Sequence, residues 1–172
     1  RVLFRSVRSR CGRFAPRRTD NIQLPFSRLA QAIPFAYLCF NEMLRDEVHS
    51  KYGLGELITV MNFNDLMLKL AGLKKNPPKA DQNWFDVELP ALALAAVKAN
   101  KNVEKYSAIC IDEFQDLVPR EAIFWPIMEL LGDPHRPVKI ALAGDDEQQI
   151  YTSGSRIDSF AWAKKQLPQL VK

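Results

Sequence analysis

The sequence lacks the residue patterns of several classes of protein. Its cysteines are three in number and form no C-x-x-C pair, and its two histidines lie far apart. This usage excludes a disulfide framework and a His/Cys zinc site, and it favours reduced thiols in a cytosolic protein. No apolar run approaches the roughly 20 residues that a membrane-spanning helix requires. We therefore expect a soluble protein with no membrane partner.

Lysine is absent from the first 36 residues, which carry eight arginines and a single acid, Asp20. The rest of the chain carries 16 basic and 19 acidic residues, so the positive charge is confined to the head. Such a head is typical of an organelle-targeting peptide, of a disordered basic tail, or of a start that is not native to the domain. We predict a basic, disordered or non-native head over residues 1–34 and one domain over residues 35–172.

Short apolar runs alternate with helical patterns beyond the head. Pro126 lies inside one helical pattern and predicts a kink or a break there. The alternation predicts an α/β fold with a parallel, doubly wound sheet. Strands are expected at 34–40, 56–61, 106–112 and 137–145, and helices at 41–53, 62–72, 84–101, 119–132 and 157–167.

Two of the expected strands end in acidic residues, in the strings ICIDE and ALAGDDEQQ. In an open parallel sheet, ligands bind beyond the carboxyl ends of the strands. An Asp at such a position can hold Mg²⁺ through its oxygens, and a following Glu can deprotonate an attacking water. The ordinary alternative is a solvated turn or a helix N-cap, and an isolated Asp-Glu pair favours that alternative.

The longer strings IDEFQD (111–116) and ALAGDDEQQIY (141–151) are more specific. They resemble motifs II and III of the UvrD/Rep-like superfamily 1 DNA helicases, in order and at plausible spacing. The resemblance implies a sheet of P-loop NTPase (RecA-like) type and the cofactors ATP and Mg²⁺. It implies that Asp112 binds Mg²⁺ through water, that Glu113 and Gln148 are catalytic, and that Asp112, Gln115, Asp145 and Gln148 bind the cofactor.

Two upstream strings resemble other motifs of the same family. AYLCFNEML is similar to motif Ia, and ITVMNFNDLML is similar to a motif usually read as Thr-Phe-His. The ordinary alternative for Phe40 and Phe63 is packing in the core. After Tyr151 the family continues with an aromatic residue and an Arg, whereas this chain reads TSGS and then Arg156. The resemblance implies contacts with DNA by Phe40, Asn41, Asn64, Tyr151 and Arg156.

A segment of the form G-x-x-x-x-G-K-[ST] is missing, because none of the seven glycines precedes a Lys. Such a loop holds the phosphates of ATP. We therefore expect an incomplete first motor domain, with little ATPase activity alone and with DNA and the remaining helicase domains as partners. The alternatives are a non-catalytic relic that binds single-stranded DNA or a partner, and an unrelated α/β domain. The expected location is the cytoplasm or the nucleoid, with organelle targeting as the lesser alternative.

Overall fold

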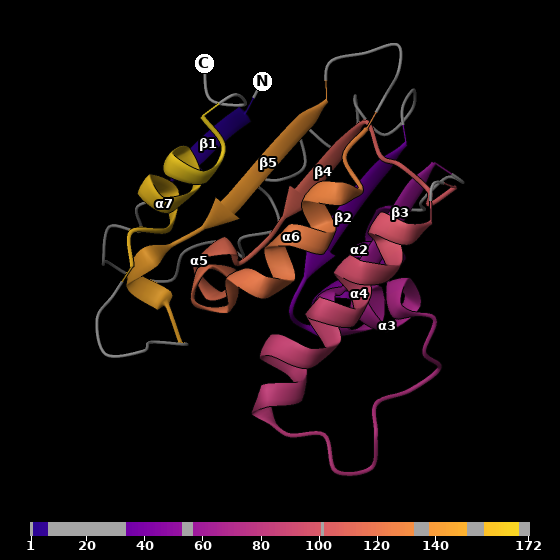
Figure 1. Ribbon diagram of the computed structural model, residues 1–172. Coiled ribbons are helices and arrows are strands. Elements are labelled where there is room, and N and C mark those ends of the chain that lie inside the picture. The colour runs from indigo at the N-terminus through magenta and orange to yellow at the C-terminus, as the bar shows by residue number, and fades with distance from the viewer. Residues whose placement is uncertain are drawn as a thin grey trace.

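The computed structural model describes residues 2–6, 34–52, 57–100, 102–132, 138–150 and 157–168, with residues 2–6, 51 and 52 described by their backbone alone. Its centre is a five-stranded sheet in the order β1-β5-β4-β2-β3, in which every pairing is parallel (Figure 1). This arrangement confirms the predicted α/β fold with a parallel sheet. The strands are β1 (Val2–Ser6), β2 (Phe35–Cys39), β3 (Ile58–Asn62), β4 (Ala108–Ile111) and β5 (Lys139–Gly144).

Helices follow the strands in the order that the sequence predicted. A π-helical turn precedes α4, and two short 3₁₀ turns follow α5 and β5. The α-helices are α2 (Glu42–Tyr52), α3 (Phe63–Ala71), α4 (Leu89–Ala99), α5 (Phe114–Leu117), α6 (Glu121–Glu129) and α7 (Ser159–Gln166), the π turn is Trp84–Glu88, and the 3₁₀ turns are Val118–Arg120 and Asp146–Gln148.

Local sequence accounts for the ends of several helices. Asn62 caps α3 by accepting a hydrogen bond from the backbone N–H of Asp65 at 2.7 Å. Gly72 ends the same helix in the left-handed conformation that glycine adopts at little cost. The predicted break at Pro126 is wrong, because α6 continues through this residue. Pro126 is the sixth residue of α6 and removes one backbone donor, and its neighbours Phe124 and Ile127 are buried.

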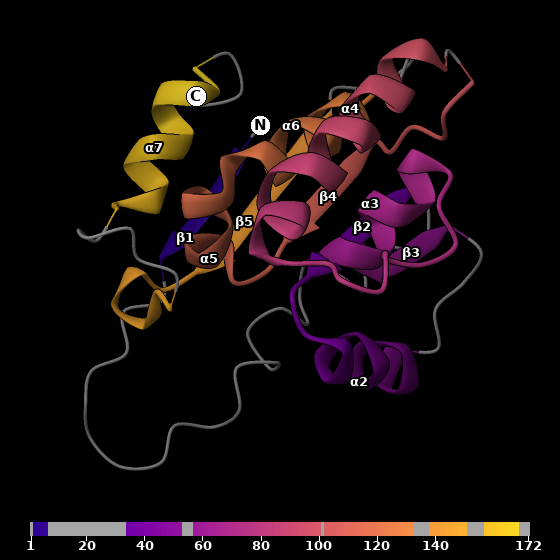
Figure 2. The ribbon, with the colours of Figure 1, turned by 60° about the horizontal axis from the view of Figure 1, so that its bottom comes forward.

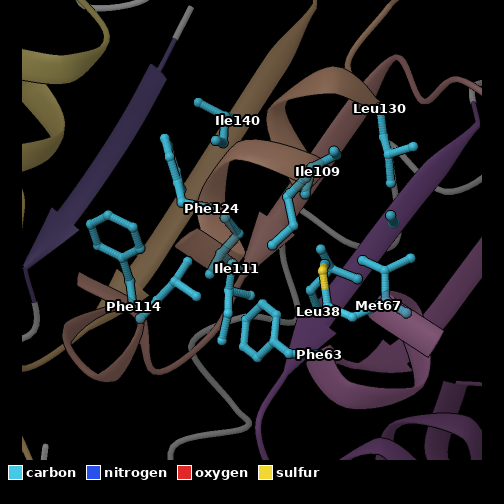
Figure 3. Packing of buried hydrophobic residues seen from close by; sticks show 14 of the residues in the cluster. Leu38, Phe63, Met67, Ile109, Ile111, Phe114, Phe124, Leu130 and Ile140 are labelled. Atoms are coloured by element: carbon cyan, nitrogen blue, oxygen red, sulfur yellow. The ribbon is translucent and has the colours of Figure 1, made fainter. Parts of the chain in front are cut away.

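The central strands β2 and β4 are buried on both faces, as expected of a parallel sheet. Leu38, Ile109 and Ile111 point towards α3, α4 and α6 and form the larger core (Figure 3). Tyr37, Cys39 and Cys110 belong to a smaller core on the opposite face, to which α2 contributes Val48. Figure 2 shows α2 on one side of the sheet and α3, α4 and α6 on the other.

The edge strand β1 lies within the stretch 1–34 for which a disordered or non-native head was predicted. Residues 2–6 instead pair in parallel with residues 140–144 of β5. For these five residues the structure gives a strand in place of disorder. Residues 7–33 lie outside the described residues, so the predicted domain boundary after residue 34 stays a prediction.

The chain reverses its direction across the sheet between β2 and β4. From β2 it passes through α2 to β3 at one edge, whereas from β4 it passes through α5 and α6 to β5 on the other side. Connections that diverge from two neighbouring parallel strands leave a crevice at their carboxyl ends, where ligands of open α/β sheets bind. The residues that follow β2 and β4 therefore border the expected binding position.

Candidate functional site

Asp112 follows β4 directly and is held by hydrogen bonds of its backbone and of its carboxylate. Its backbone N–H donates to Leu38 O at 2.9 Å and so extends the pairing with β2 by one residue. Its carboxylate accepts from the Tyr37 hydroxyl at Oδ2, at 2.5 Å, and from the Glu113 backbone N–H at Oδ1, at 3.0 Å. Asp112 is half-buried, so its carboxylate is held by the protein while part of the residue still meets solvent.

Glu113 has the only positive φ angle of any non-glycine residue among the described positions, at 51°. Residues other than Gly, Asn and Asp adopt this left-handed conformation infrequently, and they keep it only where neighbouring contacts impose it. Here Glu113 makes the turn from β4 into α5, and its backbone C=O accepts from the N–H of Asp116 at 2.9 Å. The turn separates the directions of the Asp112 and Glu113 side chains.

Gln115 joins the end of β4 to the end of β5. This residue is 1% exposed, its amide Nε2 donates to Glu113 Oε2 at 2.6 Å, and its Oε1 accepts from the backbone N–H of Asp145 at 3.0 Å. Gly144 leaves room for the amide, because a Cβ at that position would lie 2.3 Å from Gln115 Oε1. The structure thus brings together Glu113, Gln115 and Asp145, which the sequence placed in one candidate site.

The turn after β5 holds the other predicted polar residues. Asp145 Oδ1 accepts from the backbone N–H of Glu147 at 3.1 Å, and its Oδ2 accepts from Gln148 Nε2 at 2.9 Å. Gln148 is exposed and follows the same acidic turn. The structure therefore places Gln148 beside Asp145 at the surface, at the carboxyl end of the sheet.

Gln149 and Asp116 are two residues of this region that the sequence interpretation missed. Gln149 donates to Gln115 O at 2.8 Å and accepts from Ile157 N–H at 3.1 Å. Asp116 accepts from the backbone N–H of Ile150 at 2.9 Å. These bonds tie both ends of the stretch 151–156 to α5. The predicted DNA contacts Tyr151 and Arg156 lie in that stretch, outside the described residues.

Tyr37 was also missed, although the sequence contained a signal for it. A tyrosine in the middle of a strand buried on both faces needs a hydrogen-bond partner for its hydroxyl. Burial, followed by the negative charge of Asp112, raises the pKa of Tyr37 far above its ordinary value of 10.0. Burial likewise raises the pKa of the Cys39 thiol to about 12 and raises that of Cys110. The two thiols are therefore protonated and poor nucleophiles near neutral pH.

An aromatic pocket lies beside the carboxyl end of β2. It has a volume of about 240 Å³, and its walls include Phe40, Phe63, Asn64, Phe85 and Arg120. The rings of Phe40 and Phe63 have centroids 4.5 Å apart, and the guanidinium carbon of Arg120 lies 5.5 Å from the Phe40 centroid. Such a contact between a cation and the face of a ring is favourable. The pocket thus combines ring faces with a guanidinium that is itself ion-paired with Asp86.

The predicted DNA contacts differ in how the structure surrounds them. Phe63 is 3% exposed and packs in the larger core, which confirms the alternative of core packing for this residue. Phe40 is half-buried at the pocket, so one part of it remains accessible. Asn64 lines the same pocket, and its Oδ1 is buried without a hydrogen-bond partner among the described residues. Asn41 is exposed and accepts from the backbone N–H of Met43 in the first turn of α2.

A Mg²⁺ ion in proteins is held by one or two carboxylates, with waters and substrate phosphates completing its six ligands. A carboxylate has about four acceptor sites, and two of those on Asp112 are taken by Tyr37 and the Glu113 N–H. An Asp at the end of a strand can contribute to an ion that is held through water. No group of three or more His, Cys, Asp or Glu residues that could enclose a metal occurs among the described residues. The donor set therefore fits a hydrated Mg²⁺ and not a fully caged metal.

The parallel α/β sheet, with acidic residues at the carboxyl ends of two adjacent strands, is consistent with a domain of P-loop NTPase (RecA-like) type. The family model of the UvrD/REP helicase N-terminal domain matches residues 21–168. The chain therefore belongs to the UvrD-like helicase family. Comparisons with curated proteins and with solved structures found no match. None of the helices in the described parts of the chain has the length and apolar character needed to cross a membrane.

Proposed function

We propose that this chain is part of an ATP-dependent DNA helicase motor, in which ATP hydrolysis drives movement along single-stranded DNA. The observation that carries the proposal is the bridge made by Gln115 between Glu113 and the backbone of Asp145. One buried amide connects the candidate general base to the segment that leads to the predicted DNA contacts. In this proposal, a change in the charge or position of Glu113 alters the Gln115 amide, and through it the hydrogen bond to the Asp145 N–H at the end of β5.

The residues of the site have distinct chemical tasks in this proposal. Asp112 would hold a hydrated Mg²⁺ at the end of β4, and the ion when bound would neutralise charge on phosphate oxygens. Glu113 accepts the proton of the attacking water, and the hydrogen bond from Gln115 fixes the direction of its carboxylate. Gln148 and Asp145 provide further polar groups for the phosphates at the neighbouring strand end.

ATP hydrolysis by this chain alone is expected to be slight. The sequence contains no G-K-[ST] segment, so the backbone N–H groups and the Lys that usually neutralise the triphosphate are not supplied by it. The other domains of a helicase are the partners that complete the motor in this proposal. Such a motor acts on DNA in the cytoplasm or at the nucleoid.

Phosphate release in the presence of Mg²⁺ and single-stranded DNA tests the catalytic part of the proposal. We expect the chain and its Glu113→Gln variant to release phosphate at the same background rate. Release by the wild-type chain that DNA stimulates and that Glu113→Gln abolishes would show that the site works without a G-K-[ST] loop. That result would contradict the prediction that the chain alone hydrolyses little ATP, and it would support the role of Glu113 as the general base.

A second candidate function is single-stranded-DNA binding without catalysis, and the pocket at Phe40 and Arg120 favours it. An aromatic face can stack on a base, and the Arg120 guanidinium, ion-paired with Asp86, lies over the same ring. Removing such a stacking contact costs roughly 1–3 kcal/mol per base. We therefore expect Phe40→Leu to weaken binding of a labelled oligothymidine about 5- to 150-fold.

The binding experiment requires a background in which the basic head does not dominate. The five arginines between residues 8 and 18 are replaced by Gln, because an Arg-rich segment binds phosphates without specificity. Phe160→Leu is the matched control, since Phe160 packs against Phe114 at a centroid distance of 6.2 Å and does not line the pocket. Equal affinities of Phe40→Leu and Phe160→Leu would exclude stacking by Phe40.

A further inference from the structure

Tyr37 and Asp112 come from neighbouring strands and meet on one face of the sheet. Tyr37 lies opposite Cys110 in the parallel register, and Asp112 follows Cys110 by two residues. Side chains two residues apart on a strand project from the same face, about 7 Å apart along the strand. A tyrosine is long enough to span that separation, and its hydroxyl donates to Asp112 Oδ2 at 2.5 Å.

The surroundings of Tyr37 leave its ring little freedom. The residue is 1% exposed and lies in the smaller core with Cys39, Val60 and Cys110. The thiol of Cys39 is directed to backbone oxygens, those of Asn41 and Met61, at 3.4 and 3.8 Å. Close packing fixes the ring, and a fixed ring fixes the direction of the hydroxyl.

The second oxygen of Asp112 is fixed independently of the first. The backbone N–H of Glu113 donates to Oδ1 at 3.0 Å. Two donors on two different oxygens define the plane of the carboxylate as well as its position. Partners of this kind commonly orient metal ligands, and their loss typically weakens metal binding about 10- to 100-fold.

We propose that Tyr37 is a positioning residue for the metal site, whose hydroxyl holds the Asp112 carboxylate in the orientation that receives a hydrated Mg²⁺. The inference rests on the proposed function, because it assumes that Asp112 is the Mg²⁺ ligand. A G-K-[ST] loop would bring a hydroxyl to the metal site, and this sequence has none. The Tyr37 hydroxyl has a different task, because it donates to Asp112 Oδ2 and so orients the carboxylate.

The test measures Mg²⁺ binding without nucleotide, by following the amide signals of residues 112 and 113 in ¹⁵N–¹H spectra during a MgCl₂ titration. Such spectra report weak binding residue by residue. We expect Tyr37→Phe, which removes only the hydroxyl, to raise the Kd about 10-fold or more. Asp112→Asn removes the proposed Mg²⁺ ligand and shows how the spectra respond when the metal site is lost.

Tyr106→Phe is the matched control. Tyr106 is 3% exposed, and its hydroxyl is hydrogen-bonded to Thr59 Oγ1 and Glu104 Oε2, not to Asp112. The control and Tyr37→Phe each lose one hydroxyl from a buried ring, so both are expected to lower the thermal midpoint. Only Tyr37→Phe is expected to change the Kd for Mg²⁺, and a purely structural hydroxyl would leave that constant unchanged.

Two results would overturn the inference, and they differ in what else they affect. If Asp112→Asn abolishes Mg²⁺ binding and Tyr37→Phe leaves the Kd unchanged, the positioning role is wrong and the metal site stands. If wild type and Asp112→Asn respond to Mg²⁺ in the same way, the metal site of the proposed function fails and the positioning role fails with it. A raised Kd in Tyr37→Phe with the Tyr106→Phe value unchanged supports the inference.

Discussion

The side-chain amide of Gln115 lies 2.6 Å from the carboxylate of Glu113, and the same amide accepts from the backbone of Asp145 at 3.0 Å. Both contacts are made by a residue that is 1% exposed. An amide can donate and accept at once, which a carboxylate or a hydrocarbon cannot do in this position. The carboxylate of Glu113 and the backbone N–H of Asp145 therefore require an amide at position 115.

Replacing Gln115 by Leu removes both contacts and leaves the Asp145 N–H without its acceptor. A buried polar group left without a partner costs about 1–3 kcal/mol. We expect the free energy of unfolding in urea to fall by about 2 kcal/mol. Gln148→Leu is the matched control, because Gln148 is exposed, and its change is expected within about 0.5 kcal/mol. Equal losses in the two variants would contradict the importance of the bridge.

Gly144→Ala tests how closely the amide approaches β5. A Cβ at this position would lie 2.3 Å from Gln115 Oε1 and 3.1 Å from the Phe114 backbone N. Overpacking of this kind costs about 1–3 kcal/mol. Gly132→Ala is the control, since its Cβ would meet only the flexible side chain of Lys105, at 3.4 Å.

A double-mutant cycle separates the clash with Gln115 from the contact with Phe114. Gly144→Ala combined with Gln115→Ala is expected to lose less stability than the sum of the two single changes, because the shorter side chain makes room for the new methyl group. Urea unfolding of all four proteins gives the coupling. Strict additivity would mean that the backbone of Phe114, and not the amide, limits the space.

Asn64 carries a buried Oδ1 that lacks a hydrogen-bond partner among the described residues. Replacing an unsatisfied polar group by an apolar one of similar shape removes a desolvation cost of about 1–3 kcal/mol. We expect Asn64→Leu to raise the thermal midpoint and, if Asn64 serves DNA as predicted, to weaken oligothymidine binding. Asn41→Leu is a control for stability, because Asn41 is exposed and its Oδ1 is already bonded to the Met43 N–H. A lower midpoint for Asn64→Leu would contradict the prediction.

The buried thiol of Cys39 makes stability depend on pH above neutrality. Burial, and then the charge of Asp112, raises the pKa of Cys39 from 9.0 to about 12. Because the unfolded chain releases this proton first, the contribution is fully present below pH 9 and is lost as the pH rises towards about 12. The urea midpoint of the wild type is expected to fall more steeply over this range than that of Cys39→Ala. Parallel pH profiles would contradict a protonated, buried thiol.

The sequence by itself determined the order of the elements and the chemistry at their ends. Short apolar runs such as AICI alternate with helical patterns, and this alternation predicted the parallel α/β fold. The strings around Asp112 and Asp145 identified the two strand ends that carry acids, because residue type and spacing are local properties. The local sequence did not show that α6 continues through Pro126.

Tertiary structure decided which of those residues meet. Gln115 and Asp145 are 30 positions apart and Tyr37 and Asp112 are 75 apart, and no spacing rule links such pairs. Their contacts depend on the strand order, which places β4 between β2 and β5. The pocket at Phe40 likewise draws on α3, α4 and the turn at Arg120. The sequence supplied the polar side chains, and the parallel register of the strands set the distances between them.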